Sequence, residues 1–125
     1  MTPNITIVRA TAKDSHEVSE MAGELLREIM DAIGVQAFNF DIEETTDRLM
    51  DFLNREKYFV FVARDEQHSA VGFIAMVESH ALYAEGTFGT IPELYVRPGF
   101  RSRNVGLDLV AQAKSFGKSR GWTRL

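Results

Sequence analysis

The stretch from Ile91 to Gly106 limits what this chain can fold into more than any other part of the sequence. Its first residues, Ile91–Val96, combine β-branched and aromatic side chains and predict a β-strand. Pro98-Gly99 ends that strand, and an amphipathic pattern then predicts a helix running to about Arg120. A short, polar, cationic loop joins the two. Because the first N–H groups of a helix lack internal partners and the helix dipole is positive there, this geometry predicts an anion-binding site.

The loop does not match the two common phosphate-binding fingerprints, G-x-G-x-x-G and G-x-x-x-x-G-K-[ST]. It instead reads Arg-x-x-Asn-x-Gly at Arg101, Asn104 and Gly106, directly after Leu-Tyr-Val-x-Pro. This resembles the Arg/Gln-x-x-Gly-x-Gly/Ala pyrophosphate loop of the GCN5-related N-acetyltransferases, the GNAT superfamily. Asn104 stands where the family usually has its first glycine, and asparagine tolerates left-handed backbone better than other non-glycine residues. The alternative is an ordinary strand-to-helix connection with solvated arginines.

The rest of the chain follows the order of elements in that family. The patterns predict a strand at Ile5–Arg9, a helix that starts at Asp14 or Ser15 and ends at Gly34, and a second helix that starts with a capping box at Asp41–Glu44. Two apolar strands, Tyr58–Ala63 and Ala70–Val77, should form an antiparallel hairpin at the centre of the sheet. His80–Thr90 is expected to be a loop.

These elements predict one α/β (α+β) domain over residues 1–125. The expected architecture is a mixed, mostly antiparallel sheet with helices on both faces, in the order β-α-α-β-β-β-α-(β). Residues 121–125 resemble a helix cap and the first residues of a fifth strand. A complete family member continues beyond this point. An exposed sheet edge favours pairing with another chain, so a homo-oligomer, such as a dimer, is expected.

The amino-acid composition and the net charge argue against several classes of function. The chain has no cysteine, and His16, His68 and His80 are scattered, so no metal site is expected. A net charge of −4 argues against nucleic acid as a partner. The sequence has no membrane-length apolar stretch and no signal peptide, which favours a cytoplasmic protein. Acids dominate residues 14–51 and bases dominate from residue 97, which suits a cationic amine and a phosphorylated cofactor, or else reflects solvated helix faces.

The resemblance implies a site for acetyl-CoA between two diverging strands. It implies that backbone groups of the strand meet the pantetheine arm and the thioester, and that main-chain N–H groups of the loop bind the pyrophosphate. The residues concerned are Leu94, Tyr95 and Val96 in the strand, and Arg101, Ser102, Arg103, Asn104, Val105 and Gly106 in the loop. Arg101 and Arg103 can add charge-assisted contacts. No metal is implied.

Glu93 is the leading candidate for the general base, because it is a carboxylate in an otherwise apolar strand. Its alternative role is an edge or ion-paired strand carboxylate. Glu78 is a weaker candidate, and Tyr95 is a candidate proton donor unless it is simply a core aromatic. Tyr83 is a further guess for that donor. Two aromatics between the first two helices, Phe38 and Phe40, are expected to border the acceptor site.

The resulting hypothesis is an N-acetyltransferase that transfers an acetyl group from acetyl-CoA to a primary amine of a small molecule or a protein. A non-catalytic GNAT-like module that binds CoA or a partner is the alternative. An unrelated α+β interaction domain that recruits a partner through its sheet edge is a third possibility.

Overall fold

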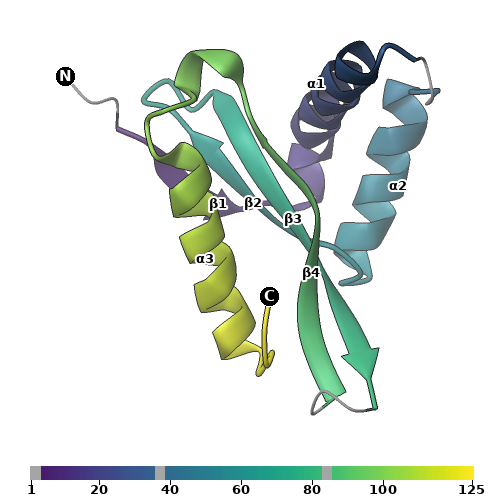
Figure 1. Cartoon of the computed structure of the whole chain (residues 1–125), viewed down its shortest axis with the longest axis vertical. Helices are drawn as coiled ribbons and strands as arrows, with labels where there is room; N and C mark the ends of the chain where they lie inside the picture. The colour runs from purple at the N-terminus through teal and green to yellow at the C-terminus, as the bar shows by residue number, and fades with distance from the viewer. Residues whose placement is uncertain (1–3, 36–38, 83–85) are drawn as a thin grey trace.

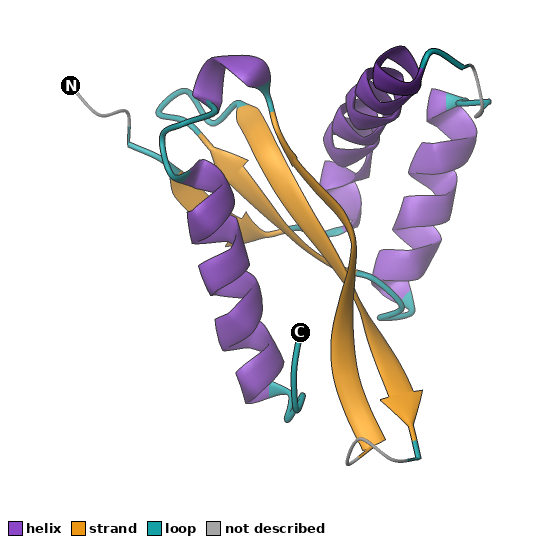
Figure 2. Ribbon diagram, viewed as in Figure 1, coloured by secondary structure: helices purple, strands orange, loops and turns teal. Residues whose placement is uncertain are grey.

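A computed structural model describes residues 4–35, 39–82 and 86–125 of the chain. Four strands form one sheet in the order β1-β2-β3-β4, and each neighbouring pair is antiparallel (Figure 1). The strands are β1 (Thr6–Arg9), β2 (Phe59–Arg64), β3 (Ala70–Ala81) and β4 (Gly86–Val96). Helices α1 (Ser15–Ile33) and α2 (Ile42–Asn54) cover one face, and α3 (Val105–Ser119) covers the other (Figure 2). The predicted element order and the helices on both faces are confirmed.

Local signals set the helix boundaries. The Asp41 carboxylate accepts a hydrogen bond from the Glu44 N–H at 3.0 Å, so the predicted cap of α2 is confirmed. Gly34 ends α1 in the left-handed conformation, with φ 71°, as a glycine C-cap should. Single 3-10 turns at Ala12–Asp14 and Pro98–Phe100 precede α1 and follow β4. Asp14 is the N-cap residue of α1, but its carboxylate accepts from the Thr11 N–H instead of from the helix.

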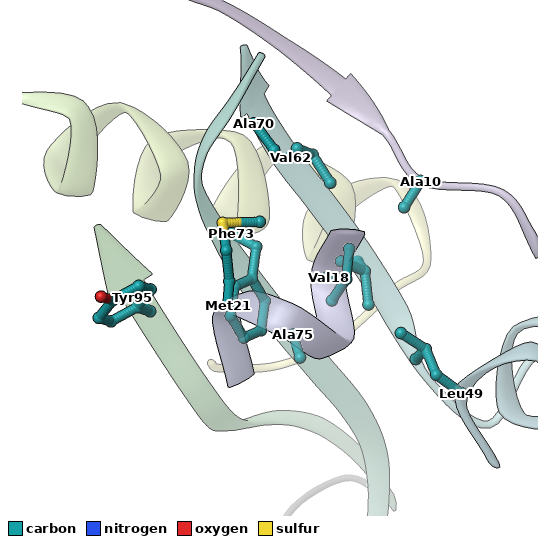
Figure 3. Packing of buried hydrophobic residues seen from close by; sticks show 10 residues of the cluster. Ala10, Val18, Met21, Leu49, Val62, Ala70, Phe73, Ala75 and Tyr95 are labelled. Carbon is teal, nitrogen blue, oxygen red and sulfur yellow. The ribbon is translucent and has the colours of Figure 1, made fainter. Parts of the chain in front are cut away.

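The predicted hairpin of β2 and β3 lies at the centre of the sheet, with Val62 paired to Phe73 in its register. Residues 59–63 of β2 and 70–76 of β3 are buried on both faces because a core lies on each side. The α1/α2 core includes Val18, Met21, Leu49, Val60, Val62, Phe73, Ala75 and Tyr95 (Figure 3). The α3 core includes Phe59, Phe61, Val71, Ile74, Met76, Val105, Leu109 and Trp122.

The expectation of a loop over His80–Thr90 is wrong. β3 continues to Ala81 and β4 already begins at Gly86, so the two strands form one long hairpin that projects past the helices (Figure 1). The side-chain hydroxyls of Ser79 and Thr90 share a cross-strand hydrogen bond of 3.0 Å. Cross-strand pairs of this kind, not a continuous apolar run, stabilise the outer half of the hairpin.

A β-bulge separates the two halves of β4. Ala75 pairs with Glu93 while Val77 pairs with Thr90, so Ile91 and Pro92 together oppose the single residue Met76. Proline has no N–H to give to a ladder and is at home in a bulge or on an edge strand. The bulge therefore sets the register of Glu93 and of every residue after it in β4.

The residues after α3 turn back along the outer edge of β4. The Thr123 N–H donates to the Thr87 carbonyl at 3.0 Å, and the Gly89 N–H donates to the Arg124 carbonyl at 2.9 Å. The expected fifth strand is present in the described residues only as this short hydrogen-bonded tail. The tail lies beside the half of β4 before the bulge, so it leaves the edge at Leu94–Val96 uncovered. None of the helices in the described ranges is apolar over the length that a membrane crossing needs.

Candidate active site

The loop between β4 and α3 holds two non-glycine residues in left-handed backbone. Ser102 and Asn104 both have φ 66°, and Asn104 is the N-cap residue of α3 without a side-chain capping hydrogen bond. Asparagine is the residue after glycine that enters this region most readily, because its short amide can compensate for the crowding. The sequence departs from the family's glycine here, but the backbone takes the turn.

The backbone N–H groups of this loop point at no protein acceptor. The first hydrogen bond of the helix runs from the Asp108 N–H to the Asn104 carbonyl, at 2.9 Å. Within the ranges that the structure describes, the N–H groups of residues 102–107 form no hydrogen bond. Consecutive free N–H groups at a helix N-terminus can hold an anion, because the donors and the helix dipole act together.

The end of β4 adds outward-facing backbone groups beside that loop. The Arg97 N–H donates to the Val71 carbonyl at 2.8 Å, and Gly72 is paired with Val96. Because the bonding direction alternates along an antiparallel strand, the N–H groups of Leu94 and Val96 face away from β3, toward the open edge. The structure thus brings residues 94–96 and 101–106 to one edge, as the sequence predicts for a ligand that contacts both.

The Arg101 side chain is already occupied. Its Nε donates to the Val96 carbonyl at 2.7 Å, and its Nη2 lies 2.6 Å from Glu28 Oε2 on α1. The hydrogen bond from Arg101 lowers the pKa of Glu28, and the same bond raises the pKa of Arg101. Arg103, by contrast, is exposed and stacks over the Phe100 ring, 5.7 Å from its centroid. Of the two arginines, Arg103 is the one free to turn toward an anion at the loop.

Tyr95 lies in the α1/α2 core, 4% exposed, with its hydroxyl donated to Glu24 Oε1 at 3.0 Å. Arg97 holds the same carboxylate with Nε at 3.1 Å and Nη2 at 2.9 Å. Burial raises the pKa of Tyr95, and the hydrogen bond to Glu24 raises it further. Tyr95 is thus both a core aromatic and a hydrogen-bond donor to α1, and its role as proton donor stays a prediction.

Glu93 projects from β4 toward α1 and α2. Its carboxylate accepts a hydrogen bond from the Tyr58 hydroxyl, at 3.1 Å to Oε1 and 3.3 Å to Oε2. Burial raises the pKa of Glu93, with the Tyr58 bond acting in the opposite direction. Burial and the neighbouring carboxylate raise the pKa of Tyr58 to about 12. Among the described residues no cation pairs with Glu93, so the ion-paired alternative is not what the structure shows.

Glu93 and Tyr58 line a cavity of about 180 Å³ between α1, α2 and the sheet. A carboxylate with a raised pKa in a partly apolar cavity is the environment in which general bases are found. Tyr58 was missed as a site residue. It opens a strand in the sequence, and nothing local connects it to a carboxylate 35 positions further on.

Glu78 lies on the opposite face of the sheet from Glu93. It accepts a hydrogen bond from the Trp122 indole N–H at 2.7 Å and pairs with Arg120 Nε at 3.1 Å. The Trp122 bond, followed by the Arg120 bond, lowers the pKa of Glu78. These contacts give Glu78 a structural role in fixing the tail after α3, away from the outward edge of Leu94 and Val96.

Phe40 lies against α1 at Gly23, where a Cβ atom would sit only 2.7 Å from its ring. It lines an open depression of about 510 Å³ that also includes Glu20, Glu24 and Arg27. Phe38 and Tyr83 lie outside the described residues. One of the acids near Phe40 is neutralised, because Glu24 pairs with Arg97.

The left-handed backbone at Asn104 gives a prediction about stability. Asn104→Ala should lower the free energy of unfolding by roughly 1 kcal/mol, because alanine lacks the amide that compensates for the strained conformation. Asn104→Gly should have the same free energy of unfolding as the wild-type protein to within about 0.5 kcal/mol, since glycine adopts positive φ without strain. Urea unfolding of the three proteins measures both values. Equal stability of the alanine and glycine variants would contradict the conformation described here.

Solved structures of similar fold are acetyltransferases. A predicted acetyltransferase with acetyl-CoA from Clostridium acetobutylicum matches with a TM-score of 0.79 and 17% identity, covering 97% of this chain and 78% of that one. The ribosomal-protein-alanine N-acetyltransferase from Brucella melitensis biovar Abortus 2308 matches at 0.76 and 15%, covering 98% and 78%. An aminoglycoside acetyltransferase from an uncultured soil metagenomic sample, in complex with sisomicin, matches at 0.73 and 20%, covering 96% and 74%.

At these identities the likeness shows the fold, which is that of the GNAT acetyltransferases. No curated protein matches the chain. The sequence model of the acetyltransferase (GNAT) family matches residues 24–125, which include the loop before α3 and all of β2, β3 and β4. The match thus spans the elements that form the outward edge and the free N–H groups, and the chain belongs to the acetyltransferase (GNAT) family.

Proposed function

We propose that this protein is an acetyl-CoA-dependent N-acetyltransferase acting on a primary amine. The observation that supports this most directly is the row of free N–H groups at residues 102–107, next to the outward-facing N–H groups of Leu94 and Val96. Family membership supports the same activity, and one structural neighbour was solved with acetyl-CoA.

The loop would hold the pyrophosphate through its main chain, with the α3 dipole adding to the attraction. Leu94 and Val96 would position the pantetheine arm and the thioester along the edge of β4. The Leu94 N–H would donate to the thioester oxygen as negative charge develops there, which is how fixed backbone donors speed acyl transfer. Because main-chain groups make these contacts, backbone shape at residues 102–106 matters more than side-chain identity.

In the transfer itself the amine nitrogen forms a bond to the acetyl carbon, and the carbon–sulfur bond breaks to release a thiolate. The amine loses a proton to the Glu93 carboxylate, either directly or through a water. Tyr95 stays the predicted donor that returns a proton to the sulfur. For that step the Tyr95 hydroxyl would have to leave its hydrogen bond to Glu24.

Calorimetric titration with CoA and acetyl-CoA, followed by a thiol-release assay with amines at pH 8, tests the proposal. We expect both ligands to bind and thiol to be released only when an amine is present. Binding without release under any amine would favour the non-catalytic CoA-binding module. Failure of both ligands to bind would favour an interaction domain. In that case the uncovered edge of β4 would be the surface that pairs with another chain, as in the expected homo-oligomer.

A further inference from the structure

The cavity beneath Glu93 has the size and chemistry of a binding pocket for an apolar group. Its volume of about 180 Å³ is close to the roughly 150 Å³ of an engineered protein cavity that binds benzene. Most of the lining is apolar and comes from α1, α2 and the sheet: Val18, Ala22, Leu49, Phe52, Val60, Phe73 and Ala75. Figure 3 shows Val18, Leu49, Phe73 and Ala75 gathered on this face of the sheet. A ring or a branched aliphatic group would lose part of its contact with water there, because the cavity opens to solvent on one side.

One polar group of the lining has no partner within the described residues. Ser19 on α1 is fully buried, and its Oγ forms no hydrogen bond. The Oγ atom has no solvent-accessible surface, so the protein encloses it and a ligand in the cavity does not reach it. The polar end of the cavity is therefore Glu93 with Tyr58, on the sheet side.

The charge around this cavity does not favour a polycationic ligand. Arg48 of α2 is exposed, borders the cavity and forms no ion pair with any described residue. Several α1 acids that the sequence offers for a cationic substrate are paired with arginines of the sheet and loop instead, as with Glu17 and Arg64, Glu24 and Arg97, and Glu28 and Arg101. An amine with a second positive charge would meet Arg48 and gain little from those carboxylates.

From these observations we infer that the cavity takes the substituent of the acceptor, and that the acceptor is a primary amine with one benzene-sized apolar group. This rests on the proposed function, because it places the amine nitrogen at Glu93 with its substituent in the cavity. The inference names an acceptor with a single positive charge and an apolar substituent, and it argues against acceptors that carry a second positive charge.

The experiment compares benzylamine, ethanolamine and spermidine as acceptors, and measures binding of each to the free protein by NMR titration. We expect kcat/KM for benzylamine to exceed that for ethanolamine and spermidine at least tenfold. Ala22→Leu fills the cavity and should weaken benzylamine binding at least tenfold. Ala32→Leu makes the same change on an exposed turn of α1 and should have no effect.

The acceptor preference of the unchanged protein tests the inference independently of whether Ala22→Leu folds. Spermidine or ethanolamine equal to benzylamine, or benzylamine binding insensitive to Ala22→Leu, would overturn the inference. The NMR titrations contain no CoA, so loss of CoA binding would defeat the proposed function while leaving the cavity result readable.

Discussion

Gly106→Val should weaken acetyl-CoA binding by roughly 100-fold, or about 2.7 kcal/mol, without unfolding the protein. In the structure a Cβ atom at this position would meet only the Val96 Cγ2 atom, at 3.9 Å, so the free protein has room for it. The space that valine would fill is the space beside the free N–H groups of the α3 N-terminus. Two added methyl groups would keep a phosphate from approaching the main chain. Calorimetric titration with acetyl-CoA measures the loss.

Two matched variants separate this effect from general damage. Gly106→Ala should bind nearly as well as wild type, because the motif that the loop resembles accepts glycine or alanine at this position. Gly99→Val places the same side chain three residues after Val96, where a Cβ atom meets nothing within 4 Å, and should also bind normally. Full affinity in Gly106→Val, with thermal unfolding unchanged, would remove the main-chain pyrophosphate site from the proposal.

Glu93→Gln should lower kcat by roughly 100- to 10,000-fold, the range that a positioned general base contributes. Glutamine keeps the shape of the side chain and can still accept the Tyr58 hydrogen bond through its amide oxygen, so the cavity should keep its form. Affinity for acetyl-CoA should be unchanged, because residues 102–107 do not contact this side chain. Steady-state kinetics on the best amine, together with calorimetry, measures both quantities. A variant that keeps wild-type kcat would exclude Glu93 as the base.

The pH dependence gives the same assignment a second readout. Burial raises the pKa of Glu93, and the base works only when ionised, so kcat/KM should fall as the pH drops through that raised pKa. Glu93→Gln should lose this acidic limb. Tyr58→Phe removes the hydrogen bond that lowers the pKa, so its acidic limb should move to higher pH. An acidic limb that stays in place in Tyr58→Phe would show that another group controls it.

Local signals predicted the fold well where a single residue decides the backbone. Asp41 caps α2 and Gly34 ends α1 because each does chemically what the pattern requires of it. The outer half of the β3–β4 hairpin was missed because no apolar run marks it. Its strands are stabilised by pairs such as Ser79 with Thr90, and a pairing is visible only when both strands are in place.

The candidate site likewise has a part that local sequence predicts and a part that depends on the tertiary structure. The edge residues and the loop were predictable, because they are contiguous in sequence and match a motif. The partnership of Glu93 with Tyr58 was not, since it depends on the registers of β2 with β3 and of β3 with β4. Charge counting was misleading for a related reason: the acids of α1 form a row in sequence, but Arg64, Arg97 and Arg101 reach them from elsewhere in the fold.

The contact between Arg101 and the Val96 carbonyl should affect the heat of binding of the proposed cofactor. That carbonyl already accepts a charged donor at 2.7 Å, so an incoming pantetheine amide would exchange one hydrogen bond for another there. Such an exchange leaves the number of bonds unchanged at this atom, and the enthalpy released should be smaller than a count of ligand contacts implies. The displaced guanidinium would be released from Val96 beside the negatively charged diphosphate, which makes arrival of the pantetheine arm and neutralisation of the diphosphate coupled events.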